Sequence, residues 1–290
     1  MVASRSLTLC SRATAWWPEA SAARAVARPF LYNGAMKIAS WNVNSLKVRL
    51  PHLQQWLGEA QPDIVALQET KLTDDKFPAD EIAAMGYRVV FSGQKTYNGV
   101  AILARAELTD VVTDIEGLDD PQRRILAATV GDIRVVNLYV VNGKALGDEK
   151  YTYKLHWLAK VRDFLEQQVA KYPKLVVLGD FNICRDDRDV YDPVAWGEDI
   201  FCSPPERAAL QALFDVGLHD SFRLFNEEAG LFSWWDYRQA AFRRNMGLRI
   251  DLILISDALK SSVTSSIIDK APRKWEQPSD HAPVALELML

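Results

Sequence analysis

The sequence predicts an α/β fold in which two mixed β-sheets pack face to face, with helices on the outside. Three observations support this prediction: candidate strands outnumber candidate helices, many strands follow one another directly, and no repeat or long Gly/Ser linker divides the chain. The apolar runs 125–130 and 133–139, for instance, are separated only by Gly131 and Asp132. A purely parallel sheet needs a long crossover between strands, so the sheets must be mixed. We expect one continuous domain spanning residues 36–290.

Short apolar runs bounded by turn residues predict the strands. In chain order these runs are 37–41, 64–68, 88–92, 100–103, 125–130, 133–139, 175–178, 231–235, 250–255 and 283–288. Apolar residues at helical spacing predict the helices. The residues concerned are Leu50, Leu53, Trp56 and Leu57 behind Pro51, then Leu155, Leu158, Leu165 and Val169, and finally Leu210, Leu213 and Phe214 after Pro205.

Composition limits the class of protein. At 290 residues with 49% hydrophobic residues, the chain can bury a large core. No apolar run approaches the roughly 20 residues that span a bilayer, so we expect no membrane association. The cysteines Cys10, Cys184 and Cys202 are odd in number and widely spaced, which argues against a disulfide framework or a thiolate zinc site. This usage is typical of a reducing compartment, and we expect a cytoplasmic protein.

The first 35 residues differ from the rest of the chain. They contain four arginines and a single acid, Glu19, with many Ala and Ser residues. A transit peptide has this bias, which would make the protein organellar, but a wrongly chosen start codon upstream of Met36 explains it equally well. We therefore predict that residues 1–35 are not part of the domain. Of the 34 basic and 38 acidic residues, the remaining 36–290 keep seven more acids than bases, so any polyanion must bind to a local basic face.

Short polar residues stand where several predicted strands begin or end. Each one alone is typical of a turn or a helix cap. Together they form an oxygen-rich set without cysteine, and such ligands suit Mg²⁺. The segments are Trp41-Asn42-Val43-Asn44, Leu67-Gln68-Glu69-Thr70-Lys71, Gly179-Asp180-Phe181-Asn182, Arg249-Ile250-Asp251 and Ser279-Asp280-His281. This set predicts a metal-dependent phosphodiesterase.

Three further segments extend this set of polar strand ends. The full set resembles the motifs of the exonuclease III family of apurinic/apyrimidinic endonucleases. The added segments are Asn137-Leu138-Tyr139 through Asn142-Gly143, Trp234-Trp235-Asp236-Tyr237-Arg238 and Gly247-Leu248-Arg249. All occur in the family's order over nearly all of residues 36–290. The resemblance implies a four-layered, DNase I-like α/β sandwich. It also implies a monomeric DNA repair enzyme that uses one or two Mg²⁺ ions, or Mn²⁺ in their place. Its substrate would be double-stranded DNA with an abasic site or a 3′ end.

Roles for the site residues follow from their chemistry and from this resemblance. Glu69 and Asp280 are the expected metal ligands, and Asn42 would assist through its amide oxygen. Asp180 would accept the proton of the attacking water. Asn182 and a charged His281 would stabilise the phosphate as it gains charge, and Asp251 would hold the imidazole. If a second ion binds, its nearest ligands would be Asp180, Asn182 and His281.

Tyr139 is expected to reach phosphate or water through its hydroxyl, although a core aromatic at a strand end is the plainer interpretation. In the family, the positions of Trp234, Leu248 and Ile250 line an apolar pocket for a flipped-out baseless sugar. Asn142 and Arg249 are expected to contact DNA phosphate. Val141 stands where many members have Pro, which makes the placing of Asn142 less certain.

Three functions fit these residues. The first is a repair nuclease that cuts 5′ to abasic sites and removes 3′ nucleotides or 3′ blocking groups. The second is a related phosphoesterase acting on inositol phosphates or phospholipids, and the third is a non-catalytic DNA-binding relative. The segment at 234–238 followed by 247–251 favours the first over the second. The complete set of acids argues against the third, because a binding module has no reason to gather like charges at a phosphate site.

Overall fold

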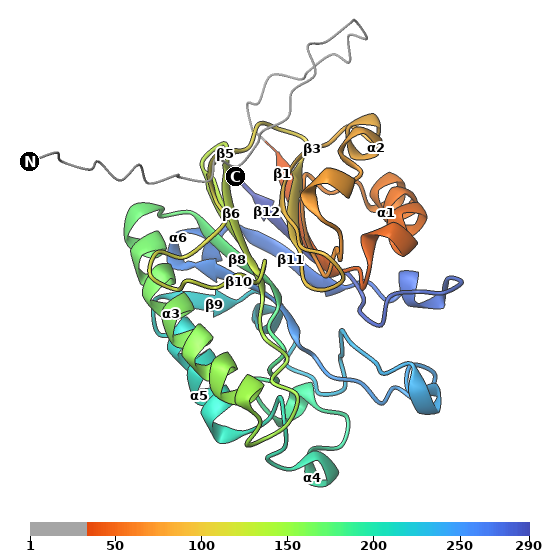
Figure 1. The fold of residues 1–290 in the computed structure, drawn as a ribbon, viewed down its shortest axis with the longest axis vertical. Coiled ribbons are helices and arrows are strands. Elements are labelled where there is room, and N and C mark those ends of the chain that lie inside the picture. Colours follow the sequence, from red (N-terminus) through yellow and green to blue (C-terminus); the bar gives the residue numbers. More distant parts are fainter. Residues whose placement is uncertain (1–33) are drawn as a thin grey trace, which may run out of the picture.

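The computed structural model describes residues 34–290, which form two six-stranded sheets packed against each other (Figure 1). The first sheet has the strand order β11-β12-β1-β2-β4-β3 and the second has the order β5-β6-β7-β8-β10-β9. The strands are β1 Ala35–Asn42, β2 Ile64–Gln68, β3 Arg88–Ser92, β4 Val100–Ala104, β5 Thr109–Val112, β6 Ile125–Val130, β7 Ile133–Tyr139, β8 Leu175–Asp180, β9 Leu218–Asp220, β10 Asp251–Ser256, β11 Val263–Ile268 and β12 Val284–Met289. Both sheets are mixed: β1 and β2 are parallel, as are β7 and β8, whereas the other neighbours are antiparallel.

Helices cover the two outer faces. They are α1 Leu46–Ala60, α2 Ala79–Ala84, α3 Glu149–Lys171, α4 Pro193–Trp196, α5 Pro204–Phe214 and α6 Asp257–Lys260. Short 3₁₀ turns occupy Asp74–Lys76, Asp187–Asp189, Phe222–Leu224, Arg238–Ala240 and Pro272–Lys274. Figure 1 shows α1 and α2 on one side of the paired sheets and α3 and α5 on the other. The predicted four-layered sandwich is therefore confirmed.

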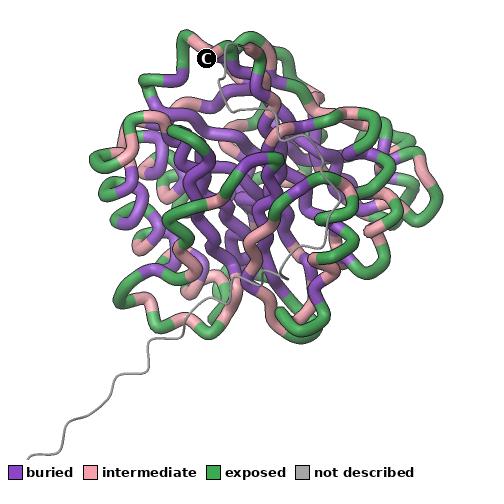
Figure 2. Tube along the Cα trace, turned by 90° about the horizontal axis from the view of Figure 1, so that it is seen from above, coloured by how far each residue is buried: buried purple, intermediate pink, exposed green. Residues whose placement is uncertain are grey.

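Side-chain alternation along the strands builds three cores. In β1, Ile38 points between the two sheets, whereas Ala39 and Trp41 point outward to α1. In β7, Val135 lies between the sheets, and Val136 packs outward against α3. Because successive side chains of a strand face opposite ways, every central strand contributes to two cores. The strands consequently form a buried interior beneath exposed loops and helix faces (Figure 2).

Most of the predicted strands are present, with one exception. The run 231–235 is not a strand, because Trp234 makes only isolated bridges, to Leu248 and to His281. The residues on either side of Trp234 form no strand, so its two bridges do not extend into a ladder. The unpredicted strands β5, β9 and β11 are short or carry exposed polar residues, so they lack an apolar run.

The predicted helices are also present, although α1 begins at Leu46, so that Pro51 lies inside the helix and not near its start. The predicted extension, residues 1–35, lies outside the described residues except for its last two, and β1 already includes Ala35. Among the helices of residues 34–290, none has the length and apolar character needed to cross a bilayer.

Candidate active site

The polar strand ends meet at one end of the sandwich. Asn42 ends β1, Glu69 follows the parallel strand β2, and Asp180 ends β8 in register with Tyr139 at the end of β7. Asp251 begins β10, which runs antiparallel to β8 and pairs Asp251 with Asp180. Parallel neighbours end at the same edge, whereas an antiparallel neighbour begins there, so the topology brings these side chains together.

A glycine permits the close strand contact under this site. Gly179 has φ of +143°, and a Cβ built on it would lie only 1.9 Å from the carbonyl oxygen of Leu138 on β7. Any other residue would therefore push apart the strands that carry Tyr139 and Asp180.

Glu69, Asp180 and His281 converge closely enough to share a cation. One potential ligand atom from each lies within 4.8 Å of the others. The Nε2 atom of His281 is 3.8 Å from the Oδ2 atom of Asp180. Two carboxylate oxygens and an imidazole nitrogen are donors that a divalent metal ion accepts. The donor set thus fits the metal site predicted from the sequence for Glu69, but with Asp180 and His281 as its partners.

His281 is held by a chain of hydrogen bonds. Its Nδ1 atom is 2.9 Å from the Oδ2 atom of Asp251, which in turn accepts a bond of 2.7 Å from the Ser233 hydroxyl. Burial disfavours the charged imidazole, but Asp251 and Asp180 outweigh it and raise the pKa of His281 to about 10. The two carboxylates therefore favour the protonated imidazole, whose Nε2 side faces Asp180.

Asp180 is almost fully buried. Burial raises the pKa of Asp180 to about 7, and the nearby carboxylates Asp251 and Glu69 add to this against the opposing charge of His281. A carboxylate with this pKa can take a proton near neutral pH. This pKa is compatible with the predicted role of Asp180 as a general base.

Asn42 links the two metal-facing acids in a way that corrects its predicted role. Its Nδ2 atom donates to Glu69 at 3.0 Å and to Asp180 at 2.9 Å, whereas its Oδ1 atom accepts the backbone N–H of Asn44. The amide nitrogen, not the oxygen, thus faces the cation site, because only a donor can bridge two carboxylates. Asn42 orients ligands and is not placed as a ligand itself.

Glu69 is bound from two further sides. The Tyr139 hydroxyl donates to its Oε1 atom at 2.8 Å, and the Lys71 ammonium lies 2.8 Å from its Oε2 atom. Burial opposes ionisation, but Lys71 and Asn42 lower the pKa of Glu69. Burial and Glu69 raise the pKa of Tyr139, so its hydroxyl stays protonated. Tyr139 is therefore a polar group of the site and not merely a core aromatic.

Asn182 and Asn142 lie beside Asp180. The Asn182 Nδ2 atom donates to the Val140 carbonyl at 3.0 Å and to Asp180 at 3.2 Å, and its Oδ1 atom accepts from Asn142 at 3.3 Å. Asn182 has left-handed φ of 49°, which turns its side chain back toward the acid. For Asn182 to bind phosphate as predicted, its bond to Asp180 would have to be exchanged.

Asp280 does not join the convergent group. Its Oδ1 atom accepts from the Asn44 amide at 2.9 Å and its Oδ2 atom from the Trp234 indole at 3.0 Å. The structure therefore places Asp280 as an anchor for Trp234 and Asn44, and its role as a metal ligand stays a prediction.

The residues predicted to bind DNA divide into two kinds. Trp234 is half-buried and packs on a cluster that contains Leu248 and Ile250, both closed to solvent. Arg249 is buried as well, and its guanidinium bonds Asp189 at 2.7 Å and Asp220 at 2.8 Å. The prediction that Arg249 contacts DNA is wrong, because both of its acidic partners hold it inside the fold.

Three further residues at or near the site, Lys71, Ser233 and Lys154, were not predicted from the sequence. Lys71 belongs to the Gln68-Glu69-Thr70-Lys71 segment, so its neighbourhood to Glu69 was visible. The signal for Lys154 is its helical spacing: it stands four residues before Leu158 and seven before Val161, on the buried face of α3. Nothing in the local sequence marks Ser233.

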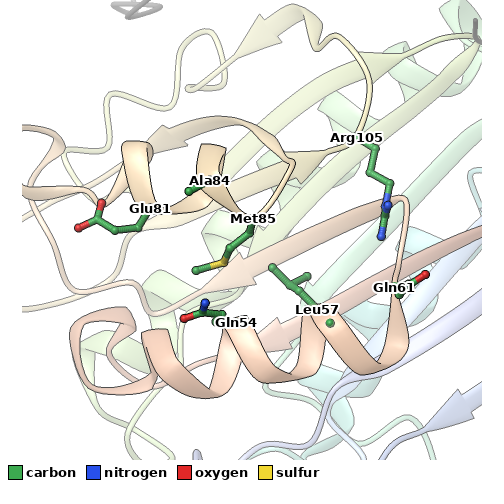
Figure 3. A pocket seen from close by; sticks show the side chains of 8 residues that line it. Gln54, Leu57, Gln61, Glu81, Ala84, Met85 and Arg105 are labelled. Carbon is green, nitrogen blue, oxygen red and sulfur yellow. The ribbon is translucent and has the colours of Figure 1, made fainter. Parts of the chain in front are cut away.

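A separate hollow of about 540 Å³ lies between α1 and α2 (Figure 3). Gln54, Glu81, Met85 and Arg105 contribute to its lining. It lies at the start of β2, whereas Glu69 follows the end of that strand, so the hollow is not part of the acidic site.

Comparisons with known proteins agree with this geometry. Residues 39–281 match the endonuclease/exonuclease/phosphatase family. Exodeoxyribonuclease III of Haemophilus influenzae is 37% identical over 268 residues, which cover 87% of this chain and 99% of the relative. A 3′ phosphatase from Neisseria, solved with a product DNA hairpin, is 50% identical with a TM-score of 0.86, covering 87% of this chain and 99% of that one. An AP endonuclease from Archaeoglobus fulgidus is 35% identical with a TM-score of 0.85, covering 88% and 100%.

Proposed function

The chain belongs to the exodeoxyribonuclease III branch of the endonuclease/exonuclease/phosphatase family, and we propose that it is a DNA repair nuclease acting on duplex DNA at 3′ ends and abasic sites. The observation that carries this proposal is the convergence of Glu69, Asp180 and His281. Relatives described as an exodeoxyribonuclease III, a 3′ phosphatase and an AP endonuclease support a substrate range that includes 3′ nucleotides, 3′ blocking groups and abasic sites.

The cation would be Mg²⁺, with Mn²⁺ as a substitute, in one or two positions. Glu69 and Asp180 would hold it beside the charged His281, and when bound it would neutralise charge on the scissile phosphate. The excess of carboxylates supports this: within residues 34–290, Glu69, Asp180 and Asp251 form ion pairs with two cations, Lys71 and His281. A buried like-charged group of this kind is costly without a further cation.

The protein's own groups divide the remaining work. Asp180 takes the proton from the attacking water at a carboxylate oxygen. The Nε2–H of His281 donates to a non-bridging phosphate oxygen, while Asp251 keeps the imidazole charged and correctly turned. Asn142 supplies an amide donor beside the same phosphate, and Asn182 supplies one after exchanging its bond to Asp180. The strand-end geometry described above supports these roles.

Substrate recognition would rest on Trp234 and the buried Leu248 and Ile250 beneath it. We propose that Trp234 covers an apolar surface for a baseless sugar, which a normal nucleotide is too bulky to occupy. The catalytic domain would comprise residues 36–290 and act as a monomer in the cytoplasm, near the nucleoid.

The test is a panel of four substrates given to the purified protein: abasic duplex, 3′-recessed duplex, 3′-phosphate duplex and an inositol phosphate. Each is assayed with Mg²⁺ and with EDTA. We expect Mg²⁺-dependent turnover of the three DNA substrates. Preferred hydrolysis of the inositol phosphate, or binding of DNA without turnover, would refute the proposal.

A further inference from the structure

Lys154 is a buried cation close to the site. It lies on α3, its side chain is fully buried, and its ammonium has three acceptors. These are the backbone carbonyl of Asn142 at 3.2 Å, the backbone carbonyl of Asn182 at 2.7 Å and the Glu206 carboxylate at 2.5 Å. A lysine ammonium has three N–H donors, so each donor has one acceptor.

Two of these acceptors belong to the turns that carry the site's amides. Asn142 follows β7 and Asn182 follows β8, and their side chains meet at 3.3 Å. Asn182 has a left-handed backbone, which Asn adopts more readily than most residues other than glycine. The bond from Lys154 to the Asn182 carbonyl fixes this turn from below. Gly143 leaves room for the lysine, because a Cβ there would lie 3.1 Å from the Lys154 Cδ atom.

Glu206 balances the charge without reaching the site. Its carboxylate also accepts from the backbone N–H of Ser203, at 3.2 Å, and from the Ser203 hydroxyl, at 2.7 Å, where it closes the capping box of α5. The lysine thus links two turns of the active site to the N-terminus of α5. A buried ion pair by itself is weak support for stability, since apolar residues can often replace it. If an apolar residue replaced Lys154, however, the backbone carbonyls of Asn142 and Asn182 would lose their donor.

We propose that Lys154 is a positioning residue that locks the Asn142 and Asn182 turns together, so that both side-chain amides are held beside Asp180, where the scissile phosphate would bind. This inference rests on the proposed function. Lys154 would touch neither substrate nor cation, and it would act only through the two backbone carbonyls. Removing it should impair the chemical step, because amides that stabilise the transition state act only when correctly placed.

The experiment compares three variants with the wild-type enzyme on its best substrate from the panel. K154M removes the three donors, E206Q keeps the lysine but neutralises its partner, and K154M/E206Q removes both buried charges. K160M, on the same helix and partly exposed, is the matched control for the loss of one positive charge. Each enzyme is measured for kcat, KM, Mg²⁺ half-saturation and melting temperature.

We expect kcat of K154M and of the double variant to fall by about 10- to 100-fold, the effect of a small misplacement of catalytic groups. We expect KM to stay within about threefold, because the loss falls on the transition state. The double variant should recover melting temperature relative to K154M without recovering kcat, and E206Q and K160M should keep near wild-type kcat.

Two results would overturn the inference. One is a double variant that regains activity together with melting temperature, since this would reduce Lys154 to a stabilising ion pair. The other is an E206Q enzyme that folds but loses as much kcat as K154M. Because all rates are ratios to wild type, an inactive wild-type enzyme would instead count against the proposed function.

Discussion

Two groups of buried charges lie close together in this fold and differ in their balance. The arginine cluster, made of Asp189, Asp220, Arg223 and Arg249, pairs two acids with two bases. The acidic centre gathers Glu69, Asp180 and Asp251 around one imidazolium, with Lys71 at its edge. Only Ile250 stands between Arg249 and Asp251, so a single segment contributes to both.

The contrast separates structural from catalytic use of buried charge. In the arginine cluster each charge lies next to an opposite charge, so the cluster buries no net charge. In the acidic centre, burial, against the opposing charge of His281 and with the help of the nearby carboxylates, raises the pKa of Asp180 to about 7. Charge imbalance in a buried site is therefore the better indicator of chemistry, and balance indicates a role in holding the fold.

The largest effect should follow from Asp180→Asn. The variant cannot take the water's proton, so kcat should fall by about 10²- to 10⁴-fold, the usual contribution of a general base. The measurement is steady-state cleavage of the preferred DNA substrate. Asp132→Asn, at an exposed position, is the control. If the kcat of D180N lay within about tenfold of the wild-type value, the loss would be too small for a general base. The acidic centre would then not differ from the arginine cluster in catalytic use.

Arg249→Met should act on stability. It leaves Asp189 and Asp220 buried without their shared partner, so the free energy of unfolding should fall by about 3–5 kcal/mol. Urea denaturation measures this loss. If the variant were as stable as wild type but bound DNA weakly, Arg249 would belong to the DNA interface after all.

Of the two groups of buried charges, only the acidic centre should bind a cation, and this binding should stabilise the folded protein. At a Mg²⁺ concentration 100 times its dissociation constant, the free energy of unfolding should rise by about 2.7 kcal/mol over the EDTA-treated protein. Glu69→Gln should abolish this rise, whereas it should persist in Lys174→Met. Thermal denaturation with and without Mg²⁺ checks both statements. Equal melting temperatures for the wild-type protein would contradict a cation site.

The smallest effect should come from an exposed ion pair. Lys174 and Asp132 lie 2.6 Å apart, but their side chains are 38% and 67% exposed. Because water screens such a pair, Lys174→Met should change the free energy of unfolding by less than about 1 kcal/mol. A loss as large as that of Arg249→Met would show that separation, and not burial, decides the worth of these pairs.

The sequence was sufficient to predict the sandwich and the main acids, because strands with clear apolar runs end in polar residues. It was not sufficient for the direction of a side chain. Asn42 was expected to present its oxygen, and Arg249 to face DNA, but hydrogen-bond partners far along the chain decide both orientations. Lys154 was overlooked because a charged residue on an apolar helix face has meaning only once its acceptors are placed.

The pairing of β1 with β12 has a practical consequence for work with this protein. Ala35 and Met289 are direct partners in that ladder, and both are exposed. Asn42 lies at the other end of β1, about 23 Å away at the usual rise of about 3.3 Å per residue. An affinity tag, a dye or a surface linker joined at either of these two positions would thus be anchored on the side of the molecule that faces away from the substrate.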